Sequence, residues 1–255
     1  SKPGRLTFAF ASCQSLEQGY YTAYERMAQD QLDLVFHLGD YIYEYKSGNQ
    51  GQVRLHHGKE IESLAEYRVR YAQYKSDQLL QNMHLRCPWF VTWDDHEVDD
   101  NYANFIAADE QTPKQLLIRR AAAYQAFYEF MPIRLPSGRQ GASMQIYRPL
   151  QFGTLIDMTI LDTRQYRNDQ ACGDGMKPSC DQHREPNRTL LGEAQKDWLF
   201  QRLRTSDATW NVMAQQVMMG RLLRRNEQEE EMYLMDIWDG YPDERDELLG
   251  RLKAA

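Results

Sequence analysis

Phe36-His37-Leu38-Gly39-Asp40-Tyr41-Ile42-Tyr43 is the stretch from which we interpret this chain of 255 residues. It continues the apolar run 32–36 and ends that run at Gly39-Asp40. A buried strand that stops at Gly-Asp delivers a carboxylate to the carboxyl edge of a sheet, where open α/β sheets bind ligands. An ordinary turn is the simpler explanation of Gly-Asp alone. The assignment of Asp40 and Tyr43 to a site therefore depends on the residues at the ends of the neighbouring strands.

Composition and charge limit the class of protein. Hydrophobic residues make up 42% of the chain and charged residues 26%, which is typical of a globular domain. The 30 Lys and Arg against 37 Asp and Glu give a net charge of −7. This charge argues against nucleic acid or an anionic membrane as the main partner. It does not exclude an anionic substrate, because bound cations can make the charge of a site locally positive. No apolar run approaches the roughly 20 residues of a membrane span.

Hydrophobic periodicity predicts a mixed α/β chain. The expected strands are 6–11, 32–38, 89–93, 145–148, 155–161 and 210–218. The expected helices are 22–30, 60–85, 113–131, 192–204 and one beginning at Pro242. The resulting order is βαβαβ, an antiparallel hairpin, then αβ. It indicates a layered α/β or α+β sandwich flanked by helices.

Three segments without periodicity are expected to be loops. The segment 44–60 is polar, and we expect His56 and His57 to be exposed in it. The segment 168–190 is long enough to predict a functional or disordered loop, and the acidic run 227–231 predicts a solvated face.

The four cysteines are too few for a disulfide scaffold. Cys172 and Cys180 share the loop 168–190, and a disulfide and two free thiols both fit their spacing. Cys87 precedes Pro88 at the start of a predicted strand and is expected to lie in the core.

Side chains of the kinds that bind metals come directly after several predicted strands. Cys13 is at the end of the first strand, Asp40 and Tyr43 are at the end of the second, and Asp162 is at the end of a later one. The densest group, Asp94–Asn101, comes after the third. Because the ends of neighbouring parallel strands meet at one edge of a sheet, we expect these side chains to converge.

The segment Asp94–Asn101 holds four aspartates, a glutamate, a histidine and an asparagine. Such a cluster repels itself unless it is neutralised, and multivalent cations are the obvious neutraliser. Oxygen ligands suit calcium or magnesium, whereas a thiolate or phenolate prefers iron or zinc, so the two ligand types indicate a mixed site. A solvated acidic loop is the alternative. His96 taken alone fits a structural role as well as a catalytic one.

The pattern Asp162-x-Arg164-x-x-Arg167 adds cationic side chains at another strand end. Arginine matches phosphate oxygens bidentately. A salt bridge from arginine to the acidic cluster is the alternative, and the two roles are compatible.

These residues resemble a known family, the PhoD-like alkaline phosphatases within the calcineurin-like metallophosphoesterases. The resemblance rests on Phe10-Ala11-Ser12-Cys13-Gln14, His37-Leu38-Gly39-Asp40-Tyr41-Ile42-Tyr43-Glu44, Thr92-Trp93-Asp94-Asp95-His96-Glu97, Leu161-Asp162-Thr163-Arg164-Gln165-Tyr166-Arg167, Trp210-Asn211-Val212-Met213-Ala214-Gln215-Gln216 and Trp238-Asp239-Gly240-Tyr241-Pro242. It covers most of the chain. It implies that residues 1–255 form one catalytic domain, a metallophosphoesterase-like layered sandwich, in a protein exported to the periplasm or secreted.

The resemblance also implies a ligand set for ferric iron and calcium. Cys13 and Tyr43 resemble the iron ligands, and Asp40 resembles the carboxylate that bridges iron and calcium. Asp95 and Asn101 resemble ligands on the second-metal side, where Asp94 and Asp100 remain alternatives.

Two further residues resemble the family's catalytic groups. His96 resembles the histidine that assists the leaving group, and Arg164 is expected to contact phosphate. The resembling family continues past the last predicted helix into a strand that ends Gly-Asp-x-His and supplies further ligands, whereas this chain ends at Ala255. We therefore expect a piece of a longer protein that holds most of the site.

The predicted function is metal-dependent hydrolysis of phosphate mono- or diesters by in-line attack of metal-bound hydroxide. Arg164 would stabilise the spreading charge and His96 would protonate the leaving alkoxide. The alternatives are a non-catalytic metal-binding domain, an incomplete inactive fragment, or a different hydrolase on the same scaffold. The loops 44–60 and 168–190 would determine the preference between monoesters and diesters.

Overall fold

Three parallel strands form the first sheet of the computed structural model, which describes residues 4–48, 51–134 and 141–254. They are β1 (Phe8–Ala11), β2 (Leu34–His37) and β3 (Trp89–Val91), in the order β1-β2-β3. Ala11 is paired with His37, and His37 with Val91, so the three strands end at the same edge. The loops that carry the predicted site residues therefore leave the sheet side by side.

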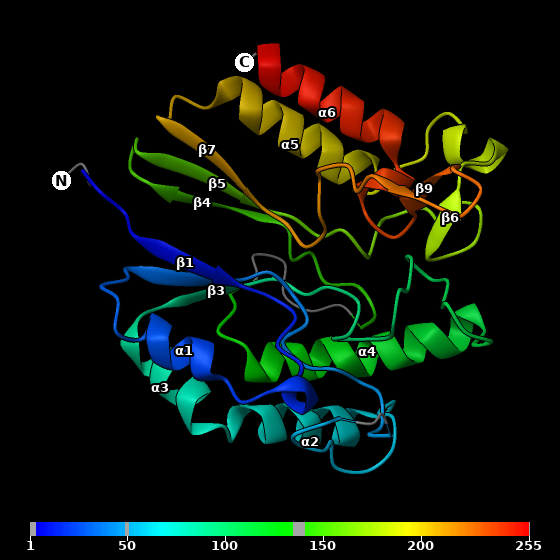
Figure 1. Ribbon diagram of the computed structural model, residues 1–255. Helices are drawn as coiled ribbons and strands as arrows, with labels where there is room; N and C mark the ends of the chain where they lie inside the picture. Colours follow the sequence, from blue (N-terminus) through cyan, green and yellow to red (C-terminus); the bar gives the residue numbers. More distant parts are fainter. Residues whose placement is uncertain (1–3, 49–50, 135–140, 255) are drawn as a thin grey trace.

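The second sheet contains an antiparallel hairpin, as expected, but the first strand expected over 145–148 is wrong, because the observed strand begins at Arg148 and continues to Phe152. It consists of β4 (Arg148–Phe152), β5 (Ile156–Ile160) and β7 (Trp210–Ala214), with β4 antiparallel and β7 parallel to β5. Apolar side chains from β2 and from this sheet form one buried cluster, which includes Phe36 and Met158. The two sheets thus lie face to face, and Figure 1 shows them stacked as the middle layers of the molecule.

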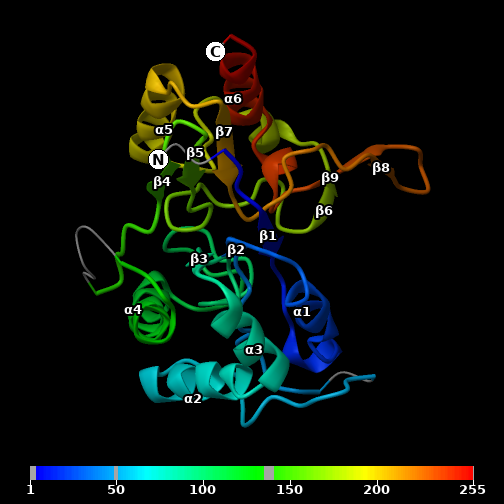
Figure 2. The same cartoon turned by 90° about the vertical axis from the view of Figure 1, so that its left-hand side faces the viewer.

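Helices cover the outer faces of both sheets, as Figures 1 and 2 show. The first sheet is covered by α1 (Thr22–Met27), α2 (Leu64–Lys75), α3 (Gln78–Arg86) and α4 (Pro113–Phe130). The second sheet is covered by α5 (Glu193–Thr205) and α6 (Pro242–Ala254). Each helical layer has its own buried apolar cluster. The expected layered α/β sandwich flanked by helices is confirmed.

A small third sheet lies near the start of α6 (Figure 1). Its strands are β6 (Met176–Pro178), β9 (Glu231–Leu234) and β8 (Arg224–Arg225), in the order β6-β9-β8. Short 3-10 helices are η1 (Leu16–Gln18), η2 (Asp181–Arg184) and η3 (Trp238–Gly240). The segment 168–190, expected to be irregular, therefore contributes a strand and a helical turn.

The single helix expected over 60–85 is wrong, because two helices form there. Ser63 and Glu66 form a capping box that starts α2 at Leu64. The side chain of Asp77 accepts hydrogen bonds from the backbone N–H groups of Leu79 and Leu80 and starts α3. An aspartate that caps a new helix competes with continuation of the preceding one, so the chain turns at this point.

His56 is also a correction, because it is buried rather than exposed. Its Nδ1 lies 2.9 Å from the carbonyl oxygen of Tyr45, and its Nε2 lies 2.8 Å from the hydroxyl of Tyr74. These two contacts fasten the loop to α2. His57 is exposed, as expected.

The cysteines differ in their surroundings. Cys172 and Cys180 form a disulfide, whereas Cys13 and Cys87 are free. Cys87 is half-buried and packs against the core of the helical layer that covers the first sheet.

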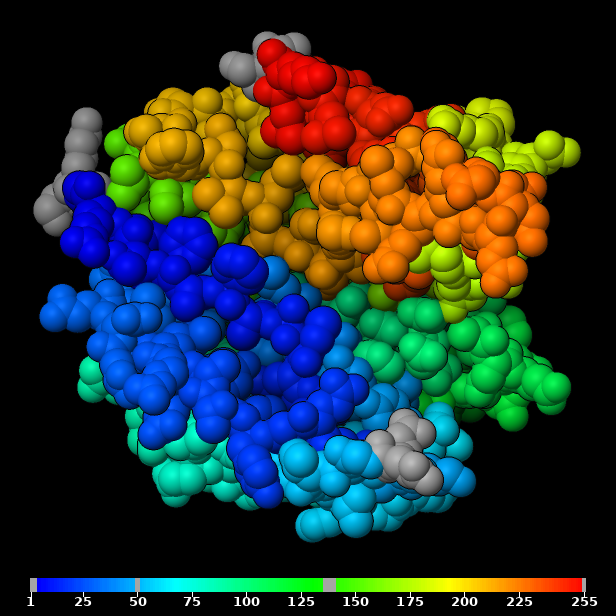
Figure 3. Space-filling model, in the orientation of Figure 1, coloured from blue at the N-terminus to red at the C-terminus, as the bar shows by residue number. Residues whose placement is uncertain are grey.

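The strand β1 lies at the open edge of the first sheet, and Figure 3 shows its segment at the surface. Phe10 in this strand is 68% exposed.

Candidate active site

Tight backbone turns bring the ends of β1 and β2 together. Cys13 and Asp40 adopt positive φ angles of 54° and 56°. The N–H of Cys13 donates to the carbonyl of Gly39 at 3.1 Å, and the N–H of Gln14 donates to that of Asp40 at 3.1 Å. Gly39 has φ +113°, and a Cβ there would lie 2.5 Å from the backbone nitrogen of Asp94. Only glycine satisfies both constraints, so Gly39 allows the ends of β2 and β3 to touch.

The side chain of Glu97 connects the loop after β2 to the loop after β3. Its buried carboxylate accepts hydrogen bonds from the N–H groups of Asp40 at 3.0 Å, Tyr41 at 2.6 Å and Asp94 at 2.8 Å. Burial raises the pKa of Glu97 to about 7, although these three N–H groups act in the opposite direction. The side chain thus fixes the position of Asp40 relative to the Asp94–Asn101 segment.

Asp40, Asp95 and His96 form the centre of the cluster. Each offers a ligand atom, and these atoms lie within 4.8 Å of one another. The Oδ1 of Asp40 is buried and accepts no hydrogen bond within the described residues. Burial, together with the charges of Asp95 and Asp94, raises the pKa of Asp40 well above its usual value. A buried carboxylate oxygen without a donor fits a cation, because a cation would both satisfy it and remove the repulsion.

Tyr43 and Cys13 both border Asp40. The hydroxyl of Tyr43 donates to the Oδ2 of Asp40 at 3.2 Å. Although Cys13 is exposed as a residue, its thiol lies beside Asp40, and burial of the thiol together with that carboxylate raises its pKa to about 12. A metal ion bound at the thiol would oppose this shift, because metal binding displaces the proton.

Asn101 contacts Asp95 directly. Its backbone N–H donates to the Oδ2 of Asp95 at 2.8 Å, and its φ is 50°. The side chain of Asp100 is 65% exposed, and its Oδ1 lies 3.8 Å from the Nε2 of His96. Asp94 is paired with Arg164 instead. Asp95 is thus the aspartate of this segment whose ligand atom forms one group with those of Asp40 and His96, within 4.8 Å of one another.

His96 is surrounded by carboxylates. Its Nδ1 lies 2.8 Å from the Oε2 of Glu44, and its Nε2 lies 3.9 Å from the Oδ2 of Asp95. Burial disfavours its charged form, but Asp95, Glu44 and Asp40 outweigh burial and raise the pKa of His96 to about 11. In the metal-free protein these carboxylates therefore favour the imidazolium form of His96, the form that can donate a proton. A cation bound by these carboxylates would oppose that shift.

Arg164 lies inside the cluster rather than at its surface. The residue is 1% exposed, and its Nε donates to the Oδ1 of Asp94 at 2.5 Å. Its Nη1 and Nη2 donate to the two carboxylate oxygens of Asp236 at 2.6 and 2.7 Å, and its Nη2 lies 3.2 Å from Asp95. This geometry does not support the expected direct contact with phosphate. It fits the alternative, a salt bridge to the acidic cluster.

Asp162 does not join the cluster. It is buried, and its Oδ1 accepts hydrogen bonds from the backbone N–H groups of Arg164 and Gln165 at 3.0 Å. Asp162 thus shapes the turn that directs Arg164 toward Asp236.

Asp236 is a site residue that the sequence patterns did not indicate. It accepts hydrogen bonds from Arg164, Arg167 and Gln170, and despite burial the two arginines hold its pKa well below its usual value. It comes after β9, a strand of four residues whose apolar signal is too short to be recognised. The only available signal was its position just before the Trp238-Asp239-Gly240 motif.

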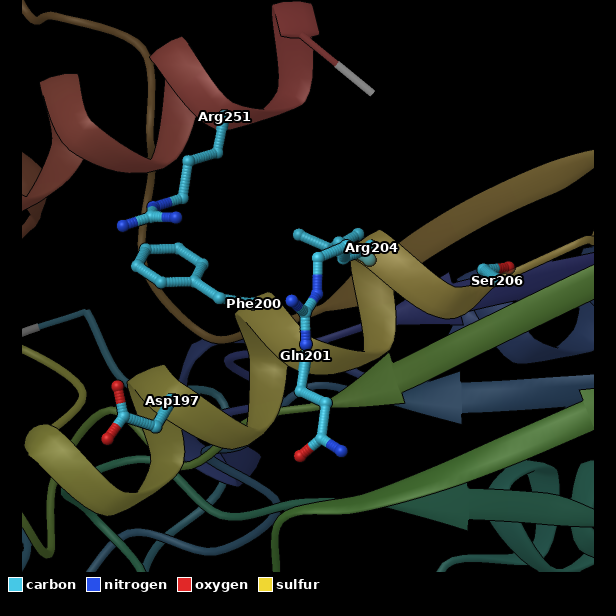
Figure 4. Close-up of a pocket in the computed structure, with 7 residues that line it drawn as sticks. Asp197, Phe200, Gln201, Arg204, Ser206 and Arg251 are labelled. Carbon is cyan, nitrogen blue, oxygen red and sulfur yellow. The ribbon is translucent and has the colours of Figure 1, made fainter.

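A pocket of about 620 Å³ lies away from this cluster. Residues of α5 and α6 line it, and Figure 4 shows Arg251 above the ring of Phe200. Its lining includes no residue of the strand-end cluster. The chemistry of the cluster therefore does not coincide with this cavity.

Comparison with known proteins agrees with the fold. The model of the PhoD-like phosphatase family matches residues 8–255. Alkaline phosphatase D of Bacillus subtilis (strain 168) is 52% identical over 254 residues, which are 98% of this chain and 43% of that protein. A solved structure described as "Structure of PhoD" superposes with a TM-score of 0.93 at 52% identity, over 98% of this chain and 48% of the other. The chain thus spans less than half the length of these relatives.

Proposed function

We propose that this chain, which belongs to the PhoD-like phosphatase family, carries the metal-binding part of the active site of a phosphoester hydrolase. The observation that supports this most directly is that carboxylate oxygens of Asp40 and Asp95 lie within 4.8 Å of each other and of a ring nitrogen of His96, which we propose as a proton donor beside the ligands. The buried Oδ1 of Asp40, which accepts no hydrogen bond within the described residues, adds the place for a cation. The substrate is a phosphate mono- or diester.

Ferric iron and calcium are the proposed metals. Cys13 and Tyr43, which border Asp40, offer the thiolate and phenolate that suit iron. Asp95 and Asn101 offer the oxygen atoms that suit calcium, and Asp40, which contacts Tyr43 and has a ligand atom within 4.8 Å of that of Asp95, would serve both groups. When bound, the ions supply positive charge for the phosphoryl oxygens and activate a water molecule as the nucleophile.

The protein's own side chains would do the remaining work. His96, held by Glu44, stands beside the cation ligands as the proton donor for the leaving alkoxide. Arg164 would act through Asp94, Asp95 and Asp236 by holding them in place. We therefore propose Arg164 as a positioning residue.

A periplasmic or extracellular location is proposed from the family and from the disulfide between Cys172 and Cys180. Disulfides persist in oxidising compartments. Within the described residues, no helix is long and apolar enough to cross a membrane.

Elemental analysis tests the proposed metals. We expect iron and calcium together in protein purified without chelator, because the ligands beside Asp40 differ in softness from those beside Asp95. Assays on phosphomonoesters and phosphodiesters of the same alcohol then identify the preferred substrate. Zinc as the only metal, or hydrolysis that survives complete metal removal, would contradict the proposal.

The substitution His96→Gln tests the proton donor. We expect the rate of hydrolysis of an alkyl phosphoester to fall about 10²- to 10⁴-fold, the usual contribution of general acid catalysis. A 4-nitrophenyl ester should be affected far less, because nitrophenolate leaves without a proton. Steady-state kcat values on both esters measure the difference, and the exposed His57→Gln serves as the matched control. Equal losses on the two esters would contradict the role of His96.

A further inference from the structure

Asn101 is held from three directions. Its backbone N–H donates to the Oδ2 of Asp95 at 2.8 Å. Its carbonyl oxygen accepts from the Nε2 of Gln170 at 2.8 Å. Its side-chain Nδ2 donates to the Oδ2 of Asp174 at 2.6 Å. A residue with so many directed contacts, at a φ of 50°, has a fixed position.

The contact with Asp174 determines which end of the Asn101 amide is available. A carboxylate only accepts hydrogen bonds, so the NH₂ group of the amide must face it. The Oδ1 of Asn101 accepts no hydrogen bond in the part of the chain that the structure describes. The amide therefore presents its oxygen, the atom that a hard cation binds, rather than its NH₂ group.

Asp174 is itself held in place. Its Oδ1 accepts from the N–H of Gly175 at 2.6 Å. The carbonyl of Gly175 accepts from the N–H of Met235 at 3.0 Å, and the neighbouring Met176 is paired with Leu234 in the third sheet. Asp174 is thus fixed to the strand that leads directly to Asp236, the partner of Arg164.

The Cys172–Cys180 disulfide closes the short loop that contains Asp174. The N–H of Cys172 donates to the Oε1 of Gln182 at 2.9 Å, which holds one end of the loop against η2. Closing a loop covalently reduces the number of conformations that it can adopt. The disulfide therefore limits how far Asp174 can move from Asn101.

We propose that Asp174 is a positioning residue for a hard cation at Asn101, and that the disulfide-closed loop 172–180 holds it there. The inference rests on the proposed function, because it takes Asn101 as a calcium ligand. The loss of a residue that orients a metal ligand typically weakens metal affinity about 10- to 100-fold. The loop thus takes part in the site although it contributes no ligand of its own.

Calcium titration calorimetry of the metal-stripped full chain tests the proposal. We expect Asp174→Ala to weaken calcium binding about 10- to 100-fold. Asp174→Asn should weaken it less, because one acceptor oxygen remains. The double substitution Cys172→Ser and Cys180→Ser should also weaken calcium binding. The iron content of the three variants as purified, before metal is stripped, should equal that of the unsubstituted chain, since Asp174 does not contact Cys13 or Tyr43. The control is Asp181→Ala, the same charge change at an exposed residue beside the loop.

The outcomes separate this inference from the proposed function. Suppose that Asp40→Asn has lost calcium binding, as the proposed function requires. If Asp174→Ala and Asp174→Asn then bind calcium as tightly as Asp181→Ala does, the inference is overturned and the proposed function is not. An unsubstituted chain that binds no calcium would overturn both. Parallel loss of iron and calcium in the Asp174 variants would show a general structural defect and would also overturn the inference. Circular dichroism of each variant verifies that it is folded.

Discussion

Replacement of Asp40 by Asn is expected to abolish phosphoester hydrolysis and cation binding together. The substitution removes the charge at the point where the ends of β1, β2 and β3 meet, and it replaces one carboxylate oxygen with an NH₂ group that repels a cation. Metal ions supply several kcal/mol of charge stabilisation in phosphoryl transfer, so we expect a loss of about 10³-fold or more in kcat/KM. Phosphatase kinetics and metal analysis of the purified variant provide the measurement.

The stability of the Asp40→Asn variant distinguishes loss of the site from loss of the fold. Burial and neighbouring charges raise the pKa of Asp40 in the folded protein. The unfolded chain therefore ionises this carboxyl group first as the pH rises, and its ionisation destabilises the folded protein above the unfolded-state pKa. Asparagine removes that effect, so the metal-free variant should be at least as stable as the parent at neutral pH.

The control for this experiment is Asp207→Asn, which makes the same charge change at an exposed carboxylate after α5. It should retain activity, metal content and stability. An Asp40→Asn variant that still binds iron and calcium, or that hydrolyses phosphoesters at the parent rate, would contradict the proposed site.

The strand ends were predictable because each is encoded locally. The apolar runs before Cys13, Asp40 and Asp94 each formed a strand, although the observed strands are shorter than expected. The turn at Gly39 was predictable because an apolar run that ends at Gly-Asp is a clear pattern for a strand followed by a turn. Parallel pairing then brings the three ends to one edge without any further information.

The roles of Asp174 and Asp236 were not predictable in the same way, because they depend on contacts between distant segments. Asp174 and Asp236 meet Asn101 and Arg164 across 73 and 72 positions of sequence. Neither aspartate comes after a strong apolar run. Nothing in the local sequence distinguishes them from the other acidic residues of their loops, and tertiary contacts alone select them.

Two errors in the predicted fold have the same origin. The helical spacing of apolar residues continues from α2 into α3, so periodicity alone gives one helix, and only the capping by Asp77 reveals two. His56 looks like a loop residue in sequence, yet Tyr45 and Tyr74 bury it. In both cases the structure depends on side-chain hydrogen bonds that hydrophobic periodicity does not reveal.

Replacement of Arg164 by Met is expected to destabilise the metal-free protein strongly, by about 3–5 kcal/mol, since removing one partner of a buried ion pair leaves uncompensated charge. Methionine keeps the unbranched apolar stem of the side chain but leaves Asp94, Asp95 and Asp236 without their shared cation. Arg164→Lys keeps the charge, but its single nitrogen cannot reach three carboxylates, so its stability should fall between those of the parent and Arg164→Met. Chemical denaturation in the presence of a chelator measures all three proteins.

The comparison with Arg184→Met determines whether Arg164 acts through the carboxylates or by touching phosphate. Arg184 forms an exposed ion pair with Asp243, and such pairs contribute no more than about 1 kcal/mol. If Arg164 only contacted phosphate, its removal would weaken inhibition by inorganic phosphate and leave the unfolding free energy of the substrate-free protein close to that of Arg184→Met. If Arg164 holds the carboxylates, the unfolding free energy falls before any substrate is added. The burial of Arg164 and its bonds to all three aspartates lead us to expect the second result.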